Sequence, residues 1–366
     1  MPDPIASTEK QFPCKSCGAS LRFAPGTTAL TCPYCHTLNQ IARDLSSGPV
    51  QELDYQQAVA DLADHEPTEE VLAVHCTVCG AESNLGANVT ADVCPFCGSA
   101  IVATTTSKKQ IRPRSLLPFN ITKEQSQASF RDWIGGLWFA PSALSKQAEA
   151  GSLKGIYLPA WTYDAGTDTD YTGERGDDYW DTETYTETVN GQTVTRTREV
   201  RRTRWHFVSG SVTDSFDDVL VMAASNLPEK HLNALEPWDL DHLVPYQDEF
   251  LSGFVSQSYQ VTLADGFQKA RQIMDVTIRQ SIESDIGGDH QRIATANTQY
   301  HDITFKHILL PVWLSAYRYN AKTYHFFINA RTGEVRGERP YSPWKITFLV
   351  VAILIVILVA FAISQR

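Results

Sequence analysis

Methionine and positive charge are both scarce in this chain of 366 residues, and cysteine does not occur after residue 97. With only three methionines, a flexible Met-lined groove that accepts many partners is excluded. The 31 lysines and arginines are outnumbered by 42 acidic residues, which gives a net charge of −11 and excludes a uniformly basic nucleic-acid-binding protein. A content of 43% hydrophobic and 20% charged residues also excludes wholesale disorder.

Long apolar runs are absent before the last twenty residues, and no secretory signal precedes Cys14. A multi-span membrane protein is therefore excluded, and the cysteines are expected to stay in a reducing compartment. The chain also lacks the phosphate-binding motif G-x4-G-K-[ST], the metalloprotease motif H-E-x-x-H, the hydrolase motif G-x-S-x-G and the dinucleotide-binding motif G-x-G-x-x-G. We expect a protein without enzymatic activity and assign no catalytic residue.

All eight cysteines fall into two quartets of identical spacing, Cys-x2-Cys-x14-Cys-x2-Cys, and the second quartet follows the first at a constant offset of 62 residues. Two such pairs of thiolates complete one tetrahedral zinc site with Zn–S distances of about 2.3 Å. Because a catalytic zinc keeps one position open, closed four-cysteine sites are structural. We predict two structural Zn²⁺ ions, one bound by Cys14, Cys17, Cys32 and Cys35 and the other by Cys76, Cys79, Cys94 and Cys97.

Two alternatives to zinc remain for these cysteines. A disulfide framework is disfavoured by the reducing compartment, and redox-active iron would not need two copies of the site. Glycine follows three of the four cysteine pairs, and His36 takes that place once. Residues 10–40 carry a net charge of +3 and residues 71–103 one of −2, so only the first module has any excess of the lysine and arginine that track phosphate.

Residues 346–363 form an uncharged apolar run that spans about 27 Å of hydrocarbon as a helix. Trp344 stands where an interfacial aromatic belongs, and Lys345 and Arg366 flank the run. We predict a single transmembrane helix that acts as a tail anchor. The reduced cysteines and the basic residues before the span place the N-terminal bulk of this single-pass cell-membrane protein in the cytoplasm.

The order of these features predicts an α+β multidomain protein with a β-rich body. A short connecting helix is expected within residues 54–66, a capped helix after Thr122 and a longer one from Thr262 to Gly287, whereas residues 103–110 read as a linker. The expected domains are a zinc ribbon at 1–45, a linker helix at 46–70, a second zinc ribbon at 71–103, the body at 104–345 and the transmembrane helix at 346–363.

Two alternating segments flank Asn190-Gly191, a strong hairpin signal. Residues 174–190 contain six carboxylates, and residues 192–206 contain five arginines. Antiparallel pairing places the two charged strands opposite one another, so we expect the arginines to be largely neutralised rather than free to bind nucleic acid or anionic lipid.

A weak internal repeat relates residues 154–161, KGIYLPAW, to residues 306–313, KHILLPVW. Pro159 and Pro311 lie inside apolar runs, where a missing N–H group calls for a sheet edge, a bulge or the start of a strand. Trp161 and Trp313 are expected to pack similarly in two related sheets.

The two four-cysteine modules, the spacer helix, the two LPxW strands, the segment 326–342 (FFINARTGEVRGERPYS) and the terminal span together resemble a bacterial family of membrane-anchored proteins with tandem transcription-factor-IIB-like zinc ribbons. The resemblance covers the whole chain. Such proteins are often labelled as related to the primosomal helicase, but the chain lacks a helicase's nucleotide-binding loop. The resemblance implies zinc at the eight cysteines, no catalytic residues, and a link to phage-shock protein A or to SPFH-type membrane-stress proteins.

These observations favour a non-enzymatic adaptor that recruits protein partners to the cytoplasmic face of the membrane. Tethering raises the local concentration of the zinc modules for membrane-associated partners. The alternative is a membrane-tethered nucleic-acid-binding protein that uses the first module and the arginines of residues 196–206. That alternative is possible but not favoured.

Overall fold

The computed structural model describes residues 12–41, 50–64, 68–84, 94, 96, 97, 99, 105–139, 153–189, 192–319, 322–338 and 341–364. The first cysteine module is a separate three-stranded sheet of β1 (Arg22–Phe23), β2 (Ala29–Thr31) and β3 (Leu38–Gln40). β1 and β2 pair antiparallel, so the segment between the two cysteine pairs folds as a small hairpin.

A twelve-stranded sheet forms the rest of the body. Its longest strands are β9 (Lys154–Val189), β10 (Gln192–Met222) and β13 (His290–Tyr319), which lie side by side in the order β10-β9-β13. The shorter strands are β4 (Leu53–Asp54), β5 (Thr68–His75), β6 (Glu82–Asn84), β7 (Thr105–Ile111), β8 (Ser115–Leu116), β11 (Val244–Pro245), β12 (Val255–Gln257), β14 (Lys322–Asn329) and β15 (Val335–Gly337).

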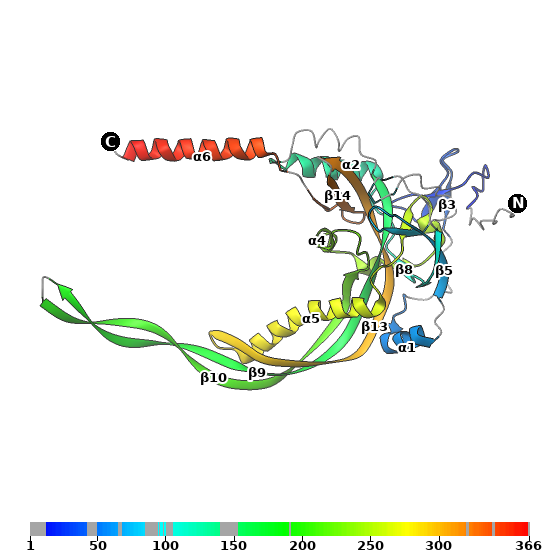
Figure 1. The fold of residues 1–366 in the computed structure, drawn as a ribbon. Coiled ribbons are helices and arrows are strands. Elements are labelled where there is room, and N and C mark those ends of the chain that lie inside the picture. Colours follow the sequence, from blue (N-terminus) through cyan, green and yellow to red (C-terminus); the bar gives the residue numbers. More distant parts are fainter. Residues whose placement is uncertain are drawn as a thin grey trace.

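Beyond His290, where β13 begins, the β9–β10 hairpin continues as a two-stranded ribbon that projects far from the body (Figure 1). Its register, with Gln192 opposite Val189, confirms the predicted hairpin, although the turn at residues 190–191 lies outside the described residues. The alternating sequence explains the ribbon, because neither strand contains proline within this stretch and threonine favours extended backbone.

The helices begin where the sequence indicates. The hydroxyl of Thr122 accepts from the Gln125 amide and the Gln125 side chain accepts from the Thr122 amide, a complete capping box before α2 (Lys123–Gly135). Thr262 caps α5 (Leu263–Ile286), whose buried stripe includes Met274 and leaves Ile273 exposed. Among the described residues the other helices are α1 (Tyr55–Asp64), α4 (Glu229–Asn233), α6 (Pro343–Ser364) and the short 3₁₀ turns η2 (Leu240–His242) and η3 (Asp248–Leu251).

The two LPxW segments lie in neighbouring antiparallel strands of one sheet, with Leu158 opposite Leu310, and not in two related sheets as expected. Both prolines sit inside long strands, away from any edge or bulge. Along one side of β9, Pro159 lies between the end of the pairing with β12 and the start of the pairing with β10. Along one side of β13, Pro311 lies between the end of the pairing with β8 and the start of the pairing with β14. A missing N–H group costs little at such a gap between successive neighbours.

Each of the two tryptophans anchors the start of a helix. The indole nitrogen of Trp161 donates to the carbonyl of Val261 and that of Trp313 to the carbonyl of Ile121, both at 2.9 Å. Each acceptor directly precedes a helix-capping threonine. The two hydrogen bonds are of the same kind. That the two LPxW segments arose by duplication stays a prediction.

Residues 105–111 form strand β7, paired with β5, and not the predicted linker. Thr105, Thr106 and Ile111 favour extended backbone, and β5 offers an edge to pair with. Helix α6 covers the predicted membrane span of residues 346–363 and projects from the body (Figure 1). Its apolar window, Pro343–Ile363, has a mean hydropathy of 3.4 and none of it is buried.

Candidate metal centres

In both modules the structure brings the four predicted cysteines together. The Sγ atoms of Cys14 and Cys35 are 3.6 Å apart and those of Cys17 and Cys32 are 3.5 Å apart. In the second module both corresponding distances, Cys76 to Cys97 and Cys79 to Cys94, are 3.7 Å. A tetrahedral ion with 2.3 Å bonds separates its sulfur ligands by about 3.8 Å, whereas a disulfide bond measures about 2.05 Å.

All eight cysteines are free thiols, so the disulfide alternative is wrong. Within each module the four sulfur atoms lie within 4.8 Å of one another, which makes each quartet a site that can hold a metal ion. These distances and the all-thiolate donor set fit the predicted zinc ions.

Backbone geometry repeats at the cysteine pairs. The amide of Gly18 donates to the carbonyl of Cys14 at 2.9 Å, and the amide of His36 donates to that of Cys32 at 3.0 Å. Gly18 and His36 have φ angles of 75° and 57°. The turn therefore requires left-handed backbone, which glycine adopts without strain and which His36 adopts at some cost.

Neighbouring polar groups stabilise the thiolates. The hydroxyl and the backbone amide of Thr37 lower the pKa of Cys35 to about 6, and the hydrogen bond from the Cys79 thiol lowers the pKa of Cys94 to about 5. The side-chain amide of Asn39 lies 3.8 Å from the sulfur of Cys14. The same hydrogen bond with Cys94 raises the pKa of Cys79, and because metal binds deprotonated thiols, loading of the second site would release the proton that Cys79 holds.

The first module packs against the body through an aromatic contact. The rings of Phe23 and Phe250 lie 5.3 Å apart. The amide of Phe23 donates to the carbonyl of Ser252 at 3.0 Å, and the hydroxyl of Ser252 donates to the carbonyl of Leu21 at 2.7 Å. The module is therefore fixed to the body at its strand edge; Cys14 and Cys32 are buried, while Cys17 and Cys35 are exposed.

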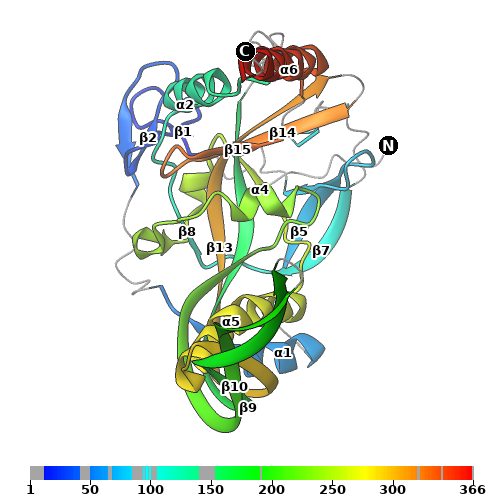
Figure 2. The same cartoon turned by 90° about the vertical axis from the view of Figure 1, so that its left-hand side faces the viewer.

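The second module is part of the main core. Its strand β6 pairs with β12, and the side chain of Gln260 donates to the carbonyl of Gly80 at 2.9 Å. His325 hydrogen-bonds the carbonyl of Phe96 at 3.0 Å. Figure 2 shows β1 and β2 of the first module on one side of β13 and β5 with β7 on the other. The core cluster that surrounds the second site contains Cys76, Ala81, Cys94, Phe96, Ile156, Leu158, Ile308 and Leu310.

The two modules differ in the solvent exposure of one pair of equivalent residues. Tyr34 and Phe96 each lie between the third and fourth cysteines, 62 residues apart, yet Tyr34 is 77% exposed and Phe96 is 0% exposed. Phe96 therefore packs in the core of the body, whereas the side chain of Tyr34 is exposed to solvent at the surface of the first module.

The hairpin arginines are paired as predicted. The guanidinium of Arg198 lies 2.8 Å from Glu183, that of Arg196 lies 3.3 Å from Glu187 and that of Arg202 lies 3.1 Å from Asp181. Two further arginines complete the set: Arg201 pairs with Asp178, and Arg204 stacks on the ring of Tyr179 at 4.8 Å.

A second polar cluster was not predicted from the sequence. Lys306, on β13, lies 2.7 Å from Asp218 and 3.0 Å from Glu52, and its side chain is only 8% exposed. Asp164 of β9 lies beside it at 3.9 Å. Four segments far apart in the chain meet here, and no local pattern marks them.

Comparison with known proteins gives one similarity over the length of the chain. The chain is 23% identical over 337 residues to the uncharacterized protein YdjG of Bacillus subtilis (strain 168), and the aligned region covers 92% of this chain and 91% of that protein. No protein-family model matches the chain, and no solved structure matches it.

Proposed function

We propose that this protein is a non-enzymatic adaptor that is anchored in the membrane by α6 and recruits a protein partner to the cytoplasmic face. The two four-cysteine sites hold structural zinc in tandem ribbons. The first module provides the recruiting surface, and the second module belongs to the supporting body.

The difference between Tyr34 and Phe96 carries this proposal. A metal site whose knuckle is buried in the core contributes folding energy. A site with an exposed tyrosine offers a large, rigid contact surface, which is typical of residues that dominate protein interfaces. Lys15, at the neighbouring knuckle of the same module, is also exposed.

The exposed apolar length of α6 supports a membrane anchor. An anchor confines the first module to a layer near the bilayer and raises its effective concentration for membrane-associated partners. The sequence resemblance points to phage-shock protein A and SPFH-type proteins as the partner class.

Ion pairing along the hairpin makes the nucleic-acid alternative less attractive. Each of Arg196, Arg198 and Arg202 has a carboxylate within 3.3 Å, so the strand presents little net positive charge to a phosphate backbone. That alternative requires binding of single-stranded or duplex DNA at low salt with a steep loss as salt rises. An anisotropy titration of the full chain tests this requirement.

The adaptor proposal is tested by affinity purification of the full-length chain from detergent-solubilised native membranes, followed by quantitative mass spectrometry. Tyr34→Ser should reduce the recovered partner at least tenfold while the chain keeps two metal ions. Val78→Ser is the matched control, because Val78 is 68% exposed at a knuckle of the second module. An identical partner set for the wild type and Tyr34→Ser would overturn the proposal.

A further inference from the structure

Two aromatic residues that follow the end of α2, Trp138 and Phe139, form a pair that is open to solvent. Trp138 is 74% exposed. Its ring stacks on that of Phe139, with the ring centres 6.0 Å apart and the ring planes 19° apart. Water solvates an exposed indole poorly, because its single N–H group is the only part that forms hydrogen bonds. The aromatic pair therefore gains free energy from any apolar surface that covers it.

The aromatic pair is attached to the residue that precedes α6. The amide of Ser342 donates to the carbonyl of Phe139 at 2.8 Å, and the carbonyl of Ser342 accepts from the amide of Ile346 at 3.2 Å. Because Ile346 is the first residue of the uncharged run, this attachment lies four residues, about 6 Å of helix, before that run. The attachment precedes the helix, so the aromatic pair stays at the start of α6 whichever direction the helix takes.

Two more exposed aromatic side chains lie at the same level. Tyr341 and Trp344 are on either side of Ser342 and Pro343 in the chain, and they are 56% and 84% exposed. The aromatic pair joins them from a segment about 200 residues earlier in the chain. Aromatic side chains gather in this way at the boundary between the headgroups and the hydrocarbon of a bilayer.

Helix α2 fixes the aromatic pair to the body. Phe130 of this helix is 3% exposed and stacks on Phe326 of β14, with the ring centres 3.8 Å apart. The turn that carries Trp138 continues from the end of the helix, because the amide of Leu137 donates to the carbonyl of Ile134 at 2.9 Å. A surface that binds Trp138 therefore also holds the sheet on which α2 packs.

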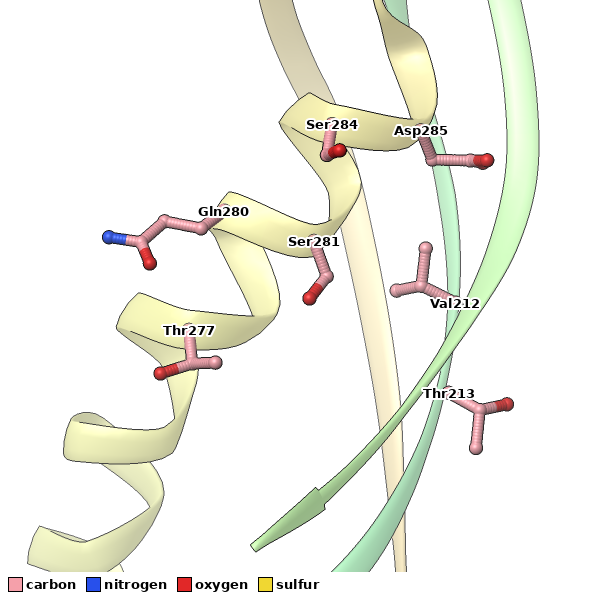
Figure 3. A pocket seen from close by; sticks show the side chains of 7 residues that line it. All are labelled: Val212, Thr213, Thr277, Gln280, Ser281, Ser284 and Asp285. Carbon is pink, nitrogen blue, oxygen red and sulfur yellow. The ribbon is translucent and has the colours of Figure 1, made fainter.

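A groove of about 590 Å³ between α5 and β10 contrasts with the aromatic pair. Figure 3 shows Thr277 and Gln280 of α5 and Thr213 of β10 among the side chains that line it. Its carboxylate, Asp285, accepts a hydrogen bond from the hydroxyl of Tyr171. Water satisfies exposed hydroxyl and amide groups, so this groove indicates no particular partner, whereas the aromatic pair calls for an apolar one.

We propose that Trp138 and Phe139 insert into the headgroup region of the bilayer beside α6, so that the membrane holds the body at a second point. This contact rests on the membrane anchor of the proposed function. The aromatic pair is too small for a stable protein partner, because each aromatic side chain buries about 150–250 Å², whereas a stable protein interface buries about 1,200–2,000 Å². The bilayer needs no larger surface here, since α6 enters it at this level.

Quenching by brominated lipids tests the contact in the full-length chain reconstituted into vesicles of phosphatidylcholine and phosphatidylglycerol. Bromine atoms near the top of the acyl chains quench tryptophans that lie close to them. Trp138→Phe and Trp344→Phe should each lower the bromine-dependent loss of fluorescence by about a third or more, because both indoles lie at the interface. Trp180→Phe is the matched control and should leave the loss unchanged, since Trp180 is 68% exposed but lies on the hairpin ribbon.

The three variants separate the second contact from the anchor itself. An effect of Trp344→Phe without an effect of Trp138→Phe overturns the second contact and leaves the anchor intact. If neither variant changes the quenching, the anchor fails and the second contact fails with it. An equal effect of Trp180→Phe shows that any exposed indole meets the lipid, which also overturns a specific contact at Trp138.

Photo-cross-linking in the same vesicles identifies what covers the aromatic pair. Replacement of Trp138 by p-benzoylphenylalanine should yield lipid adducts on illumination, detected by mass spectrometry of the chain. The same replacement of Trp180 should yield none. Adducts between two copies of the chain, without lipid adducts at position 138, would show that a second copy covers the aromatic pair and would overturn the lipid contact.

Discussion

Lys306 and Glu52, 254 residues apart in the chain, form an ion pair with Nζ 3.0 Å from Oε1. Glu52 belongs to the segment between the two cysteine modules, and Lys306 lies in the central strand β13. Asp164 and Asp218 complete the surroundings of this lysine. The cluster therefore joins the segment between the modules to the root of the hairpin.

Lys306→Met should lower the free energy of unfolding by about 3–5 kcal/mol, because three carboxylates would lose the buried cation that compensates them. Chemical denaturation of the full chain in detergent measures the change. Lys269→Met is the control: Lys269 pairs with Glu229 at a similar distance, 2.8 Å, but on the surface, where a pair contributes about 0–1 kcal/mol. Equal losses in the two variants would contradict a buried role for Lys306.

Asp164 should make stability depend on pH. Burial raises the pKa of Asp164 to about 6, so the folded chain holds a proton that the unfolded chain, with a pKa near 3.9, has released. This contribution is complete below about pH 4 and is lost as the pH rises through 6. The hydrogen bond with Asp164 lowers the pKa of Glu52, which acts in the opposite sense at lower pH.

Asp164→Asn should therefore flatten the decline in melting temperature between pH 4 and pH 6. Thermal unfolding followed by circular dichroism across this range gives the comparison. A variant that keeps the slope of the wild type would show that another group carries the proton.

The two metal sites should differ in their contribution to stability. Cys94 is 1% exposed within the main core, so Cys94→Ser should remove one metal ion and unfold or strongly destabilise the body. Cys17 occupies an exposed position in the first module, and Cys17→Ser should remove one metal ion while the body keeps its melting temperature within a few degrees. Metal analysis with differential scanning calorimetry tests this contrast, which two equal melting temperatures would refute.

The two anchoring tryptophans should be equivalent in energy. Trp161→Phe and Trp313→Phe each remove an indole donor from a backbone carbonyl, at an expected cost of about 1–3 kcal/mol, since the carbonyl is left without its partner. Equilibrium denaturation of both variants provides the measurement. A loss confined to one of them would show that the two contacts, although alike in geometry, differ in burial or in the helix that they hold.

Removal of residues 343–366 should release the chain from the membrane. The helix is apolar and carries no charge between residues 346 and 363, and it favours the bilayer because its backbone groups are satisfied internally. Fractionation of cells that express the full and the shortened chain measures the result. A shortened chain that stays in the membrane fraction would place the main membrane contact elsewhere.

Local signals predicted much of what the structure contains. The spacing of the eight cysteines predicted two clusters because ligand geometry is set by the residues that separate the ligands. Thr122 and Thr262 predicted helix starts because a capping hydroxyl acts within one turn. The uncharged terminal run predicted α6 because membrane insertion depends on local apolarity.

Tertiary structure alone decided how these parts are used. The same cysteine module is buried at Phe96 and exposed at Tyr34, because burial depends on which body surface each module meets. Pro159 and Pro311 fit inside long strands because neighbouring strands end and begin beside them. Lys306 lies close to carboxylates from three distant segments of the chain. Sequence patterns specify ligand spacing and helix ends, which are local, whereas burial, strand neighbours and charge compensation arise from contacts between residues that only folding brings together.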